Sequence, residues 1–498
     1  MFPTKKTILL LLGGVILFTF ISYLTDSRYQ LQKPVNRQDI QPRRDNPPRR
    51  IISNRRNYVN RTTYRDNRPW THTSNLPLAI IDTNGRWIPD EPKIPARMKI
   101  IYDESGGKNS LNSTHIHFDG QIGIEVRGQT SQMFPKKQYG FEFRDVQGND
   151  KDVSIFNLPA ESDWVLNGPY SDKTLMRNYL AYEFSNRIGR YASRTKFVEL
   201  FLNDRGDKTI RSGHYVGVYL LIEKIKRGKE RVDIQSLKST HTKESEITGG
   251  YIIKIDKMDR NETFFYTQRG THLAYVYPKG REMSVAQRLW IRDYMNKFEA
   301  VLASSKFNDP KHGYAKYIDI DSFIDHFIIN ELFKNTDGFR FSAYMSKERD
   351  GKLAAGPVWD FNLSSGNTVF HDGWETDSWL IYTNPVPFWW HRLVSDENFK
   401  AKLVKKWKTL RKNELATSEI LDEIDRTAEF LSEAQKRNFQ RWNVLGSMLF
   451  GNPGPGRLTY QGEVDEMKTW LQTRLEWMDK NIELLPQRFR YTRRNRRF

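Results

Sequence analysis

One segment in the second half of the chain constrains the fold most, because it has the pattern of a β-hairpin with an aspartate at each end. Apolar and polar residues alternate from Phe339 to Ser346, and a second strand-like run extends from Lys352 to Trp359. The Asp350-Gly351 pair between the two runs is a strong hairpin signal. Asp337 precedes the first run and Asp360 follows the second. Pairing of the two runs would therefore bring the two aspartates close together.

Two carboxylates held close together need a chemical reason, because like charges repel and raise the pKa of one of them. Shared binding of a divalent cation is one reason, and a division of labour between a general base and a metal ligand is another. The alternative is that Asp337 and Asp360 only cap turns, as aspartates commonly do. The run Trp359-Asp360-Phe361-Asn362 favours a functional site, because it places an aromatic plane beside cation ligands.

The positive charge of the chain is concentrated at its ends. The 498 residues carry a net charge of +19, but most of this surplus lies in residues 1–75 and in the tail that begins at Pro486. The body between them is nearly neutral. Flexible basic ends favour anionic surfaces such as lipid headgroups or polymers of the cell envelope. Nucleic acid is a less favoured partner, because only the charged ends support it.

Two features favour a location outside the cytoplasm. The chain contains no cysteine, which excludes disulfides, thiolate nucleophiles and cysteine-ligated zinc. Residues Thr7 to Leu24 form an uncharged apolar run, just long enough as a helix to cross a hydrocarbon core of about 30 Å. No small-x-small cleavage site follows, so we expect a signal anchor over residues 1–25 rather than a cleaved signal peptide. Basic residues on both flanks leave the orientation of this segment open.

The remainder of the chain divides into three parts. Residues 26–75 are rich in Arg, Asn and Pro and lack apolar periodicity, which predicts a basic disordered linker. Residues 76–485 carry the folded domain, and residues 486–498 form a basic tail. Strand patterns dominate the first half of the domain and helical patterns the second, which predicts an α+β fold with a strand-rich first lobe and a helix-rich second lobe. Strands are expected at Leu78–Asp82, Met98–Asp103, Ile122–Arg127, Lys137–Phe143, Lys196–Leu202, Tyr215–Ile222 and Tyr251–Ile255, and helices at Lys173–Ile188, Ser284–Ser304, Asp321–Phe333, Ser418–Asn438 and Gly462–Ile482.

A turn of small and cationic residues between two early strands suits phosphate oxygens. It includes Arg127, Ser131, Lys136 and Lys137. Lys137 shares a strand face with apolar residues by the period of two, so we expect it, rather than Lys136, to bind phosphate. The alternative is that Lys137 extends its amine to water at the start of the strand.

Several acidic residues have alternative structural explanations. Asp172 is a plausible N-cap for the helix over residues 173–188, and Glu183 in that helix either pairs with the phosphate-binding lysine or is solvated. Asp319 and Asp321 have the look of a metal-binding pair, but we expect them to cap the helix that follows, because acidic residues favour the first turn.

Four motifs taken together resemble the CotH kinase family, the spore coat protein H type of atypical protein kinase. They are VRGQTSQMFPKKQY, SDKTLMRN, GVYLLIEKIKRGKERVDI followed by GGYIIKID, and NTDGFRFSAY with GPVWDFN. Their order and composition are similar to the family's over roughly residues 76–485. The resemblance implies a bilobal atypical protein-kinase-like fold that uses ATP and Mg²⁺ to phosphorylate serine or threonine.

The resemblance also implies roles for individual residues, because the order of the motifs is that of a kinase. Asp337 would orient or deprotonate the acceptor hydroxyl, Asp360 would bind magnesium, and Lys137 would bind phosphate. Two residues depart from the pattern: Ser342 stands where kinases place a metal-binding Asn, and Asn362 stands where many relatives carry an acid. The implied cofactor contacts are Arg127, Ser131, Lys137, Glu223 and Trp359, the last with Tyr219 or Tyr251 around the adenine, and the implied metal ligands are Asp360, Asn362 and Ser342.

We therefore expect a membrane-anchored, extracytoplasmic protein kinase that acts on Ser or Thr of coat or envelope proteins. The alternative is a non-catalytic envelope or spore-coat assembly module, a pseudokinase. The neutral residues Ser342 and Asn362 favour this alternative, because they reduce the negative charge that would hold cations.

Overall fold

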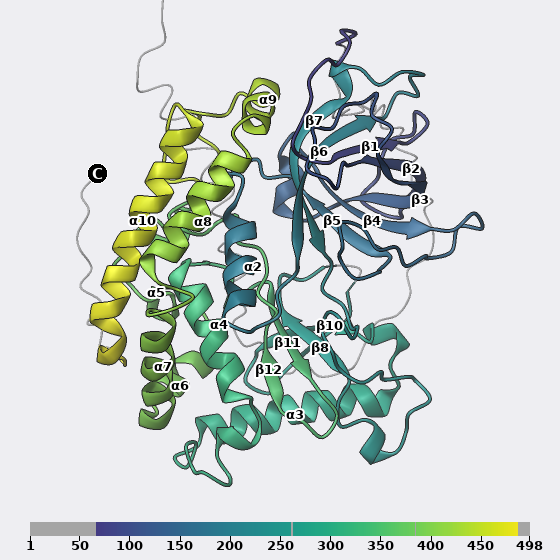
Figure 1. The fold of residues 1–498 in the computed structure, drawn as a ribbon. Helices are drawn as coiled ribbons and strands as arrows, with labels where there is room; N and C mark the ends of the chain where they lie inside the picture. The colour runs from purple at the N-terminus through teal and green to yellow at the C-terminus, as the bar shows by residue number, and fades with distance from the viewer. Residues whose placement is uncertain (1–65, 260–261, 384, 487–498) are drawn as a thin grey trace, which may run out of the picture. The chain divides into compact units, whose positions relative to one another are not determined.

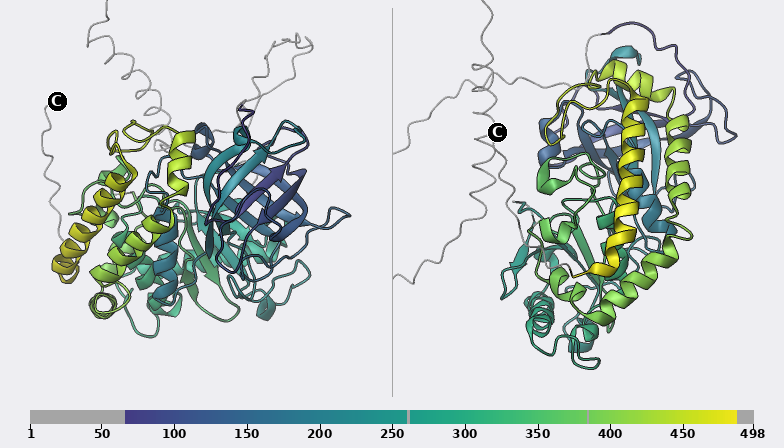
Figure 2. Two further views of the ribbon diagram at one scale, coloured as in Figure 1. Left: turned by 45° about the horizontal axis from the view of Figure 1, so that its top comes forward. Right: turned by 90° about the vertical axis from the view of Figure 1, so that its left-hand side faces the viewer.

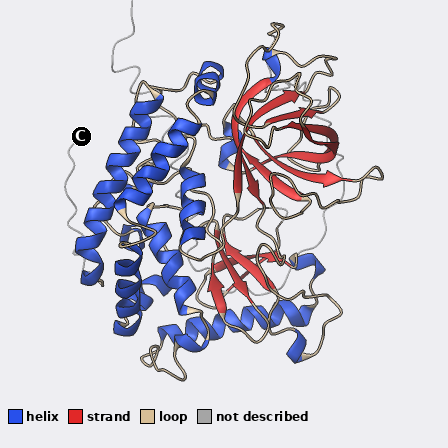
Figure 3. Cartoon of the chain, in the orientation of Figure 1, coloured by secondary structure: helices blue, strands red, loops and turns tan. Residues whose placement is uncertain are grey.

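The computed structural model describes residues 66–259, 262–383 and 385–486, all of which belong to one compact unit. The expected signal anchor, most of the expected linker and the basic tail from residue 487 lie outside the described residues. Within the described part, every helix is too short or too polar to cross a membrane. The fold is α+β, with a strand-rich N-terminal region and a helical C-terminal region (Figures 1 and 3), as the sequence predicts.

Seven strands of the first region close into a barrel in the order β1-β2-β3-β4-β5-β7-β6 (Figure 1). Neighbouring strands are antiparallel except β1 and β6, whose parallel pairing closes the barrel. Alternate residues of each strand point inward, so Tyr139, Phe141 and Phe143 of β4 all lie in the barrel core. The strands are β1 (Leu78–Asp82), β2 (Ile94–Ile101), β3 (Ile116–Arg127), β4 (Gln138–Arg144), β5 (Asp163–Asn167), β6 (Thr195–Asn203) and β7 (Tyr215–Glu223).

Residues 66–75, which composition assigns to the linker, pack on the barrel. The Trp70 ring stacks on the Tyr215 ring at a centroid distance of 4.7 Å. It also meets the edge of the Phe201 ring at 4.9 Å. The described structure therefore begins before the expected boundary at residue 76, because this aromatic contact holds a segment whose other residues are mostly polar.

A second sheet has the order β12-β11-β8-β10-β9. Its β11–β12 hairpin pairs Met345 with Ala355, so the predicted hairpin forms. The hairpin is shorter than its alternating pattern, because the chain leaves the sheet at Gly356, where φ is 105°. The strands are β8 (Tyr251–Ile255), β9 (Phe264–Tyr266), β10 (His272–Tyr277), β11 (Ala343–Lys347) and β12 (Leu353–Ala355).

The helices gather on one side of the barrel, and α10 runs along the outside of this helical region (Figure 2). Two predicted helices differ from the structure. Asp172 does not cap a helix start at residue 173, because its carboxylate accepts from Thr174 and from the Arg177 amide, and α2 begins only at Arg177. The helix expected over 418–438 is divided into α8 and α9. The helices are α2 (Arg177–Arg187), α3 (Val285–Ala303), α4 (Ile320–Leu332), α5 (Leu380–Thr383), α6 (Trp389–Val394), α7 (Glu397–Leu410), α8 (Thr417–Phe430), α9 (Ala434–Arg441) and α10 (Tyr460–Asn481).

Strand β7 contributes to two hydrophobic cores. Tyr219 and Leu221 point into the barrel core, whereas Val218, Leu220 and Ile222 belong to the large core shared by the helices and the second sheet. Because side chains alternate along a strand, this fully buried strand packs on the barrel core with one face and on the large core with the other, and β5 and β6 also reach the large core through Val165 and Phe197.

A buried ion pair fixes the end of α4. Arg474 of α10 lies 3.0 Å from Glu331, and neither side chain is exposed. Glu331 also accepts hydrogen bonds from the amides of Leu380 and Ile381. The pair therefore holds α4, α5 and α10 together.

We predict that Arg474→Ala lowers the free energy of unfolding by about 3–5 kcal/mol, because it leaves the Glu331 carboxylate buried without its partner. Denaturant unfolding followed by circular dichroism measures the change. Arg457→Ala is the matched control, since the Arg457–Glu466 pair lies on the surface, where such pairs contribute less than about 1 kcal/mol. Equal losses in the two variants would contradict the prediction.

Candidate functional site

Helix α4 delivers Asp337 through a tight turn. Asp319 caps the start of α4 by accepting from the amides of Asp321 and Ser322, so the acidic pair is a cap, as expected. After α4, Lys334 adopts a left-handed conformation with φ of 49° and reverses the chain. The turn that follows carries Asp337 and leads into β11.

The side chain of Asn335 connects the turn of Asp337 to the segment of Asp360. Its Oδ1 accepts a hydrogen bond from the Asp337 amide at 3.2 Å. Its Nδ2 donates to the carbonyl oxygen of Trp359 at 3.3 Å. Asn335 has no exposed surface; its bond to Trp359 is buried, and its bond from the Asp337 amide is partly buried. One buried amide group thus sets the spacing between the two predicted aspartates.

Asp360 is held by helix α2. It has a positive φ of 61°, a conformation that aspartate adopts more readily than most residues. Its amide donates to the hydroxyl of Tyr182 at 3.1 Å, and the next amide, that of Phe361, donates to Oδ1 of Asn178 at 2.6 Å. Both partners lie on α2. The sequence alone indicated no role for Asn178. Its hydrogen bond from the Phe361 amide shows that it orients the turn at Asp360.

The two carboxylates belong to one electrostatic cluster. Burial, together with the negative charges of Asp337 and Asp256, raises the pKa of Asp360 to about 6, against the opposing effects of Arg127 and Lys257. Burial also raises the pKa of Asp337, with Lys257 and Arg340 opposing the shift. The hairpin therefore brings the two aspartates within electrostatic reach of each other, as its pattern predicts.

Asp256 and Lys257, which follow β8 directly, were not among the residues expected from the sequence. Asp256 lies 2.9 Å from the ammonium group of Lys254 and accepts from the Lys257 amide. The ammonium group of Lys257 lies 3.4 Å from the hydroxyl of Thr130 and 5.1 Å from the centre of the Phe341 ring. The only available signal was the position of both residues at the end of a strand-like run.

The basic residues of the predicted phosphate-binding turn lie in different surroundings: Arg127 lies near Asp360, whereas Lys136 and Lys137, both within the described chain, do not contact it. The Arg127 guanidinium lies 5.7 Å from the centre of the Trp359 ring, which places it beside Asp360. Gly128 has φ of 89° and lies so close to Ser131 that a Cβ there would collide with the Ser131 hydroxyl, so the start of the turn 128–133 requires glycine. Thr130 in this turn contacts Lys257. Arg127 and Lys257 thus act on the carboxylate of Asp360, whereas Ser131 is placed by its contact with Gly128.

The two neighbouring lysines have different partners. The half-buried Lys137 donates to the carbonyl oxygen of Gln132 at 2.6 Å, and burial lowers its pKa. Lys136 is fully buried and donates to the carbonyl oxygen of Val218 and to Oδ1 of Asn438. Among the described residues, neither lysine contacts Asp337 or Asp360. Lys137 is thus held by its own loop, and its role in phosphate binding stays a prediction.

Glu183 and Glu223 have other partners. Glu183 pairs with Arg187 at 2.8 Å, one turn along α2. Glu223 is fully buried, and its carboxylate lies 2.7 Å from Arg194 and 3.7 Å from Arg231. Glu223 therefore forms a buried ion-pair cluster with Arg194 and Arg231 at the end of β7.

The aromatic residues expected around adenine are not brought together. Trp359 is only 9% exposed and stacks on Tyr182 at a centroid distance of 5.8 Å. Tyr219 is buried in the barrel core and donates to the carbonyl oxygen of Lys137. Tyr251 is buried in the other core and stacks on Trp290. Trp359 alone lies beside the carboxylate cluster.

The oxygen donors near Asp360 fit a hard cation. Oδ1 of Asn362 is buried and has no hydrogen-bond partner among the described residues, so a donor group is left over beside Asp360. Ser342 has φ of 50° and lies directly before β11. No group of three or more acidic, histidine or cysteine side chains in the described chain is arranged to hold a metal. The oxygen donors of Asp360, Asn362 and Ser342 fit Mg²⁺, because this ion typically binds one or two carboxylates and completes its coordination shell with water and substrate phosphates.

Two hollows elsewhere in the described chain do not include these carboxylates. One of about 170 Å³ is lined by residues that include Arg231, His326 and Val358. This volume is below the range of about 300–1,000 Å³ usual for ligand pockets. The other hollow lies along α7. The case for a site at Asp337 and Asp360 therefore rests on the charges gathered there and on the unpaired oxygen of Asn362, and not on a cavity.

Comparison with known proteins places the chain in a family. A search of curated proteins finds no match. A family model described as CotH kinase protein matches residues 124–478. The match begins at the end of β3 and ends within α10, so it covers well over half of the chain and contains both Asp337 and Asp360. The chain is a member of the CotH kinase family.

Proposed function

We propose that this protein is an ATP- and magnesium-dependent protein kinase that transfers the γ-phosphate to Ser or Thr of coat or envelope proteins. The observation that carries the proposal is the pair Asp337 and Asp360, which lie in one half-buried electrostatic cluster with Arg127 and Lys257. Membership of the CotH kinase family gives the reaction class. A phosphoryl transferase needs such a set, because its catalysis rests on positioning and charge neutralisation.

Asp337 orients the acceptor hydroxyl and takes its proton in this proposal. Burial raises the pKa of Asp337, which brings it closer to the working pH of a general base. The hydrogen bond from the Asp337 amide to Asn335 fixes the turn. The Asp337 carboxylate is therefore already oriented toward the acceptor hydroxyl when the substrate binds.

In this proposal Asp360 and Asn362 hold magnesium, and Ser342 is the third candidate ligand. The metal, when bound, would neutralise charge on the triphosphate. Arg127, Ser131, Lys137 and Lys257 would contact phosphate oxygens, and Lys257 is an addition to the residues expected from the sequence. Trp359 stays the residue proposed for the adenine side of the site.

A non-catalytic assembly module is the second candidate function. The observation that favours it is the neutral character of Ser342 and Asn362, together with the lack of a three-acid metal cluster in the described chain. For either function, we propose that the protein is anchored to the membrane and faces the cell envelope. Its basic ends would contact anionic polymers there.

We predict that the full chain binds ATP only in the presence of Mg²⁺, and that Asp360→Ala abolishes this binding, because a ligand and its charge are removed. Isothermal titration calorimetry with and without Mg²⁺ measures both effects. Asp350→Ala is the matched control, since Asp350 is exposed in the turn of the same hairpin. A wild-type chain that does not bind ATP would favour the assembly module.

We predict that Asp337→Asn binds Mg-ATP within about threefold of wild type but slows transfer to a serine-containing acceptor by about 100-fold or more, the usual range for loss of a general base. The amide keeps the size of the side chain but accepts no proton. Single-turnover transfer of radiolabelled phosphate measures the rate. Wild-type transfer by this variant would show that Asp337 is not the base.

Asp360 should also make the stability of the metal-free protein depend on pH. Its pKa lies at about 6 in the folded protein, against an ordinary value of 3.8. The folded state thus binds this proton more tightly, and the resulting stabilisation is complete below about pH 4 and is lost as the pH rises through about 6. We predict that Asp360→Asn removes this dependence, which amounts to at most about 3 kcal/mol.

Urea unfolding in EDTA between about pH 4 and pH 7 measures this dependence. The wild type should lose more stability over this range than Asp360→Asn, and Asp350→Asn should follow the wild type. Parallel curves for wild type and Asp360→Asn would contradict the assignment of a buried carboxylate with a raised pKa.

A further inference from the structure

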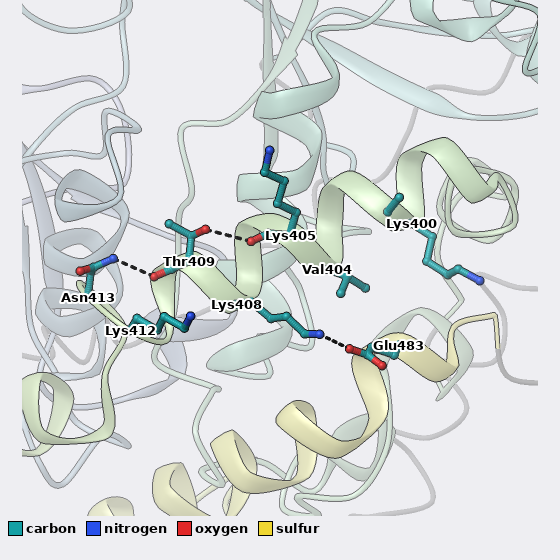
Figure 4. A pocket seen from close by; sticks show the side chains of 9 residues that line it. Lys400, Val404, Lys405, Lys408, Thr409, Lys412, Asn413 and Glu483 are labelled. Atoms are coloured by element: carbon teal, nitrogen blue, oxygen red, sulfur yellow. Dashed lines mark hydrogen bonds and ion pairs between the residues drawn. The ribbon is translucent and has the colours of Figure 1, made fainter.

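A hollow of about 620 Å³ lies along the outer face of α7. Figure 4 shows the side chains that line it, which come from α7, from the turn after it and from the last turn before residue 486. Four of them are lysines: Lys400, Lys405, Lys408 and Lys412. The one carboxylate among them is Glu483. We call this hollow the lysine groove.

Helix periodicity explains why the lysines share one face. Lys400, Val404 and Lys408 are spaced by four residues, which places them along one side of α7, and Lys412 follows in the turn after the helix. The opposite side carries Phe399, Leu403, Trp407 and Leu410, all buried in the large core. Packing of that apolar side fixes the helix and presents the lysines outward.

The lysine groove carries more positive than negative charge. Lys408 pairs with Glu483, and Lys400 lies 2.6 Å from Glu397. Among the described residues, Lys405 and Lys412 have no carboxylate within ion-pair distance. Like charges held along one helix repel each other, so an anionic occupant would lower the electrostatic energy of this face.

We propose that the lysine groove is a docking site for an acidic segment of a protein partner. The chain's own ends do not fit, because residues 487–498 contain six Arg and no acid, and residues 26–75 are also strongly basic. The hollow shape favours an extended segment over a flat bilayer, and its apolar lining is limited to the small side chains Ala401 and Val404. Docking itself does not depend on catalysis, but the identification of the partner as a substrate rests on the proposed kinase function.

The groove is tied to the helix that delivers Asp337. Lys406, on the same helix as the groove lysines, lies 3.4 Å from Asp325 of α4. Asp325 also accepts a hydrogen bond from Arg190 at 2.7 Å. A segment bound along α7 would therefore dock on the lobe that carries the proposed base, which is where a kinase benefits from retaining its substrate.

Because the chain contains no cysteine, a single introduced thiol reports binding at its own position. An acidic peptide bound to the basic ends of the chain does not contribute to this signal. Thr409→Cys places a single thiol in the groove, the groove thiol, and Thr240→Cys places one at an exposed position outside it, the reference thiol. The full chain of each variant is mixed, without nucleotide, with a peptide of alternating glutamate and serine that ends in an activated cysteine. Formation of the mixed disulfide is followed by mass spectrometry, and a glutamine–serine peptide corrects for the intrinsic reactivity of each thiol.

We expect the acidic peptide to react about tenfold faster at the groove thiol than at the reference thiol after this correction, because docking raises its local concentration. Adding Lys405→Glu and Lys412→Glu to the Thr409→Cys variant should remove the preference. Adding Lys151→Glu and Lys311→Glu instead, which makes the same charge change at exposed sites elsewhere, should keep it. Thermal unfolding checks that the variants fold equally well.

Equal corrected rates at the two thiols, or a preference that survives reversal of the groove lysines, would overturn the proposal. Binding of lipid, and not of the acidic peptide, to the lysine groove would also overturn the proposal. An environment-sensitive dye on the groove thiol that responds to vesicles of phosphatidylcholine and phosphatidylserine, with no preferential disulfide, would identify a membrane surface. Because no arm contains nucleotide, these results are independent of whether the protein transfers phosphate.

Discussion

The partial burial of two carboxylates within electrostatic reach of each other is the constraint on which the rest of the site depends. A buried carboxylate is costly unless hydrogen bonds, cations or protonation offset the loss of water. Here Asn335 fixes one turn to the other, and Arg127 and Lys257 supply opposing charge. The raised pKa of Asp360 shows that these groups offset the cost only in part. A bound cation would favour the ionised form of Asp360, which accords with the magnesium dependence that we propose.

Helix α2 links this site to the barrel. Its Asn178 and Tyr182 hold the Asp360 turn through backbone amides. Its start is fixed by the buried Asp172–Arg177 pair. Arg177 also donates to the carbonyl oxygens of Ser364 and Ser365, just after the proposed metal-binding segment. In this family member the helix thus acts through main-chain positioning, while Glu183 pairs within the helix.

The sequence predicted those parts of the fold that local patterns determine. The bounds of β1 and β8, the hairpin and the division into a strand-rich and a helical region all follow from periodicity and turn residues. The late start of α2 does not, because it depends on where the Asp172 carboxylate finds donors. Lys257 was missed for a similar reason: its contact with Thr130 joins residues 127 positions apart. The pairing of Glu223 with Arg194 and Arg231 is equally a product of the tertiary fold, and nothing in the local sequence indicates it.

Strand β7 has a consequence for how the molecule can move. Because its alternate side chains are embedded in two cores, the barrel cannot swing away from the helices without pulling apart one of them. Asn438 of α9 reinforces this junction by accepting from both Lys136 and the Val218 amide. Opening and closing by rotation of whole lobes is therefore costly here. The barrel and the helical region therefore form one rigid frame, and the carboxylates of Asp337 and Asp360 are held in place within it.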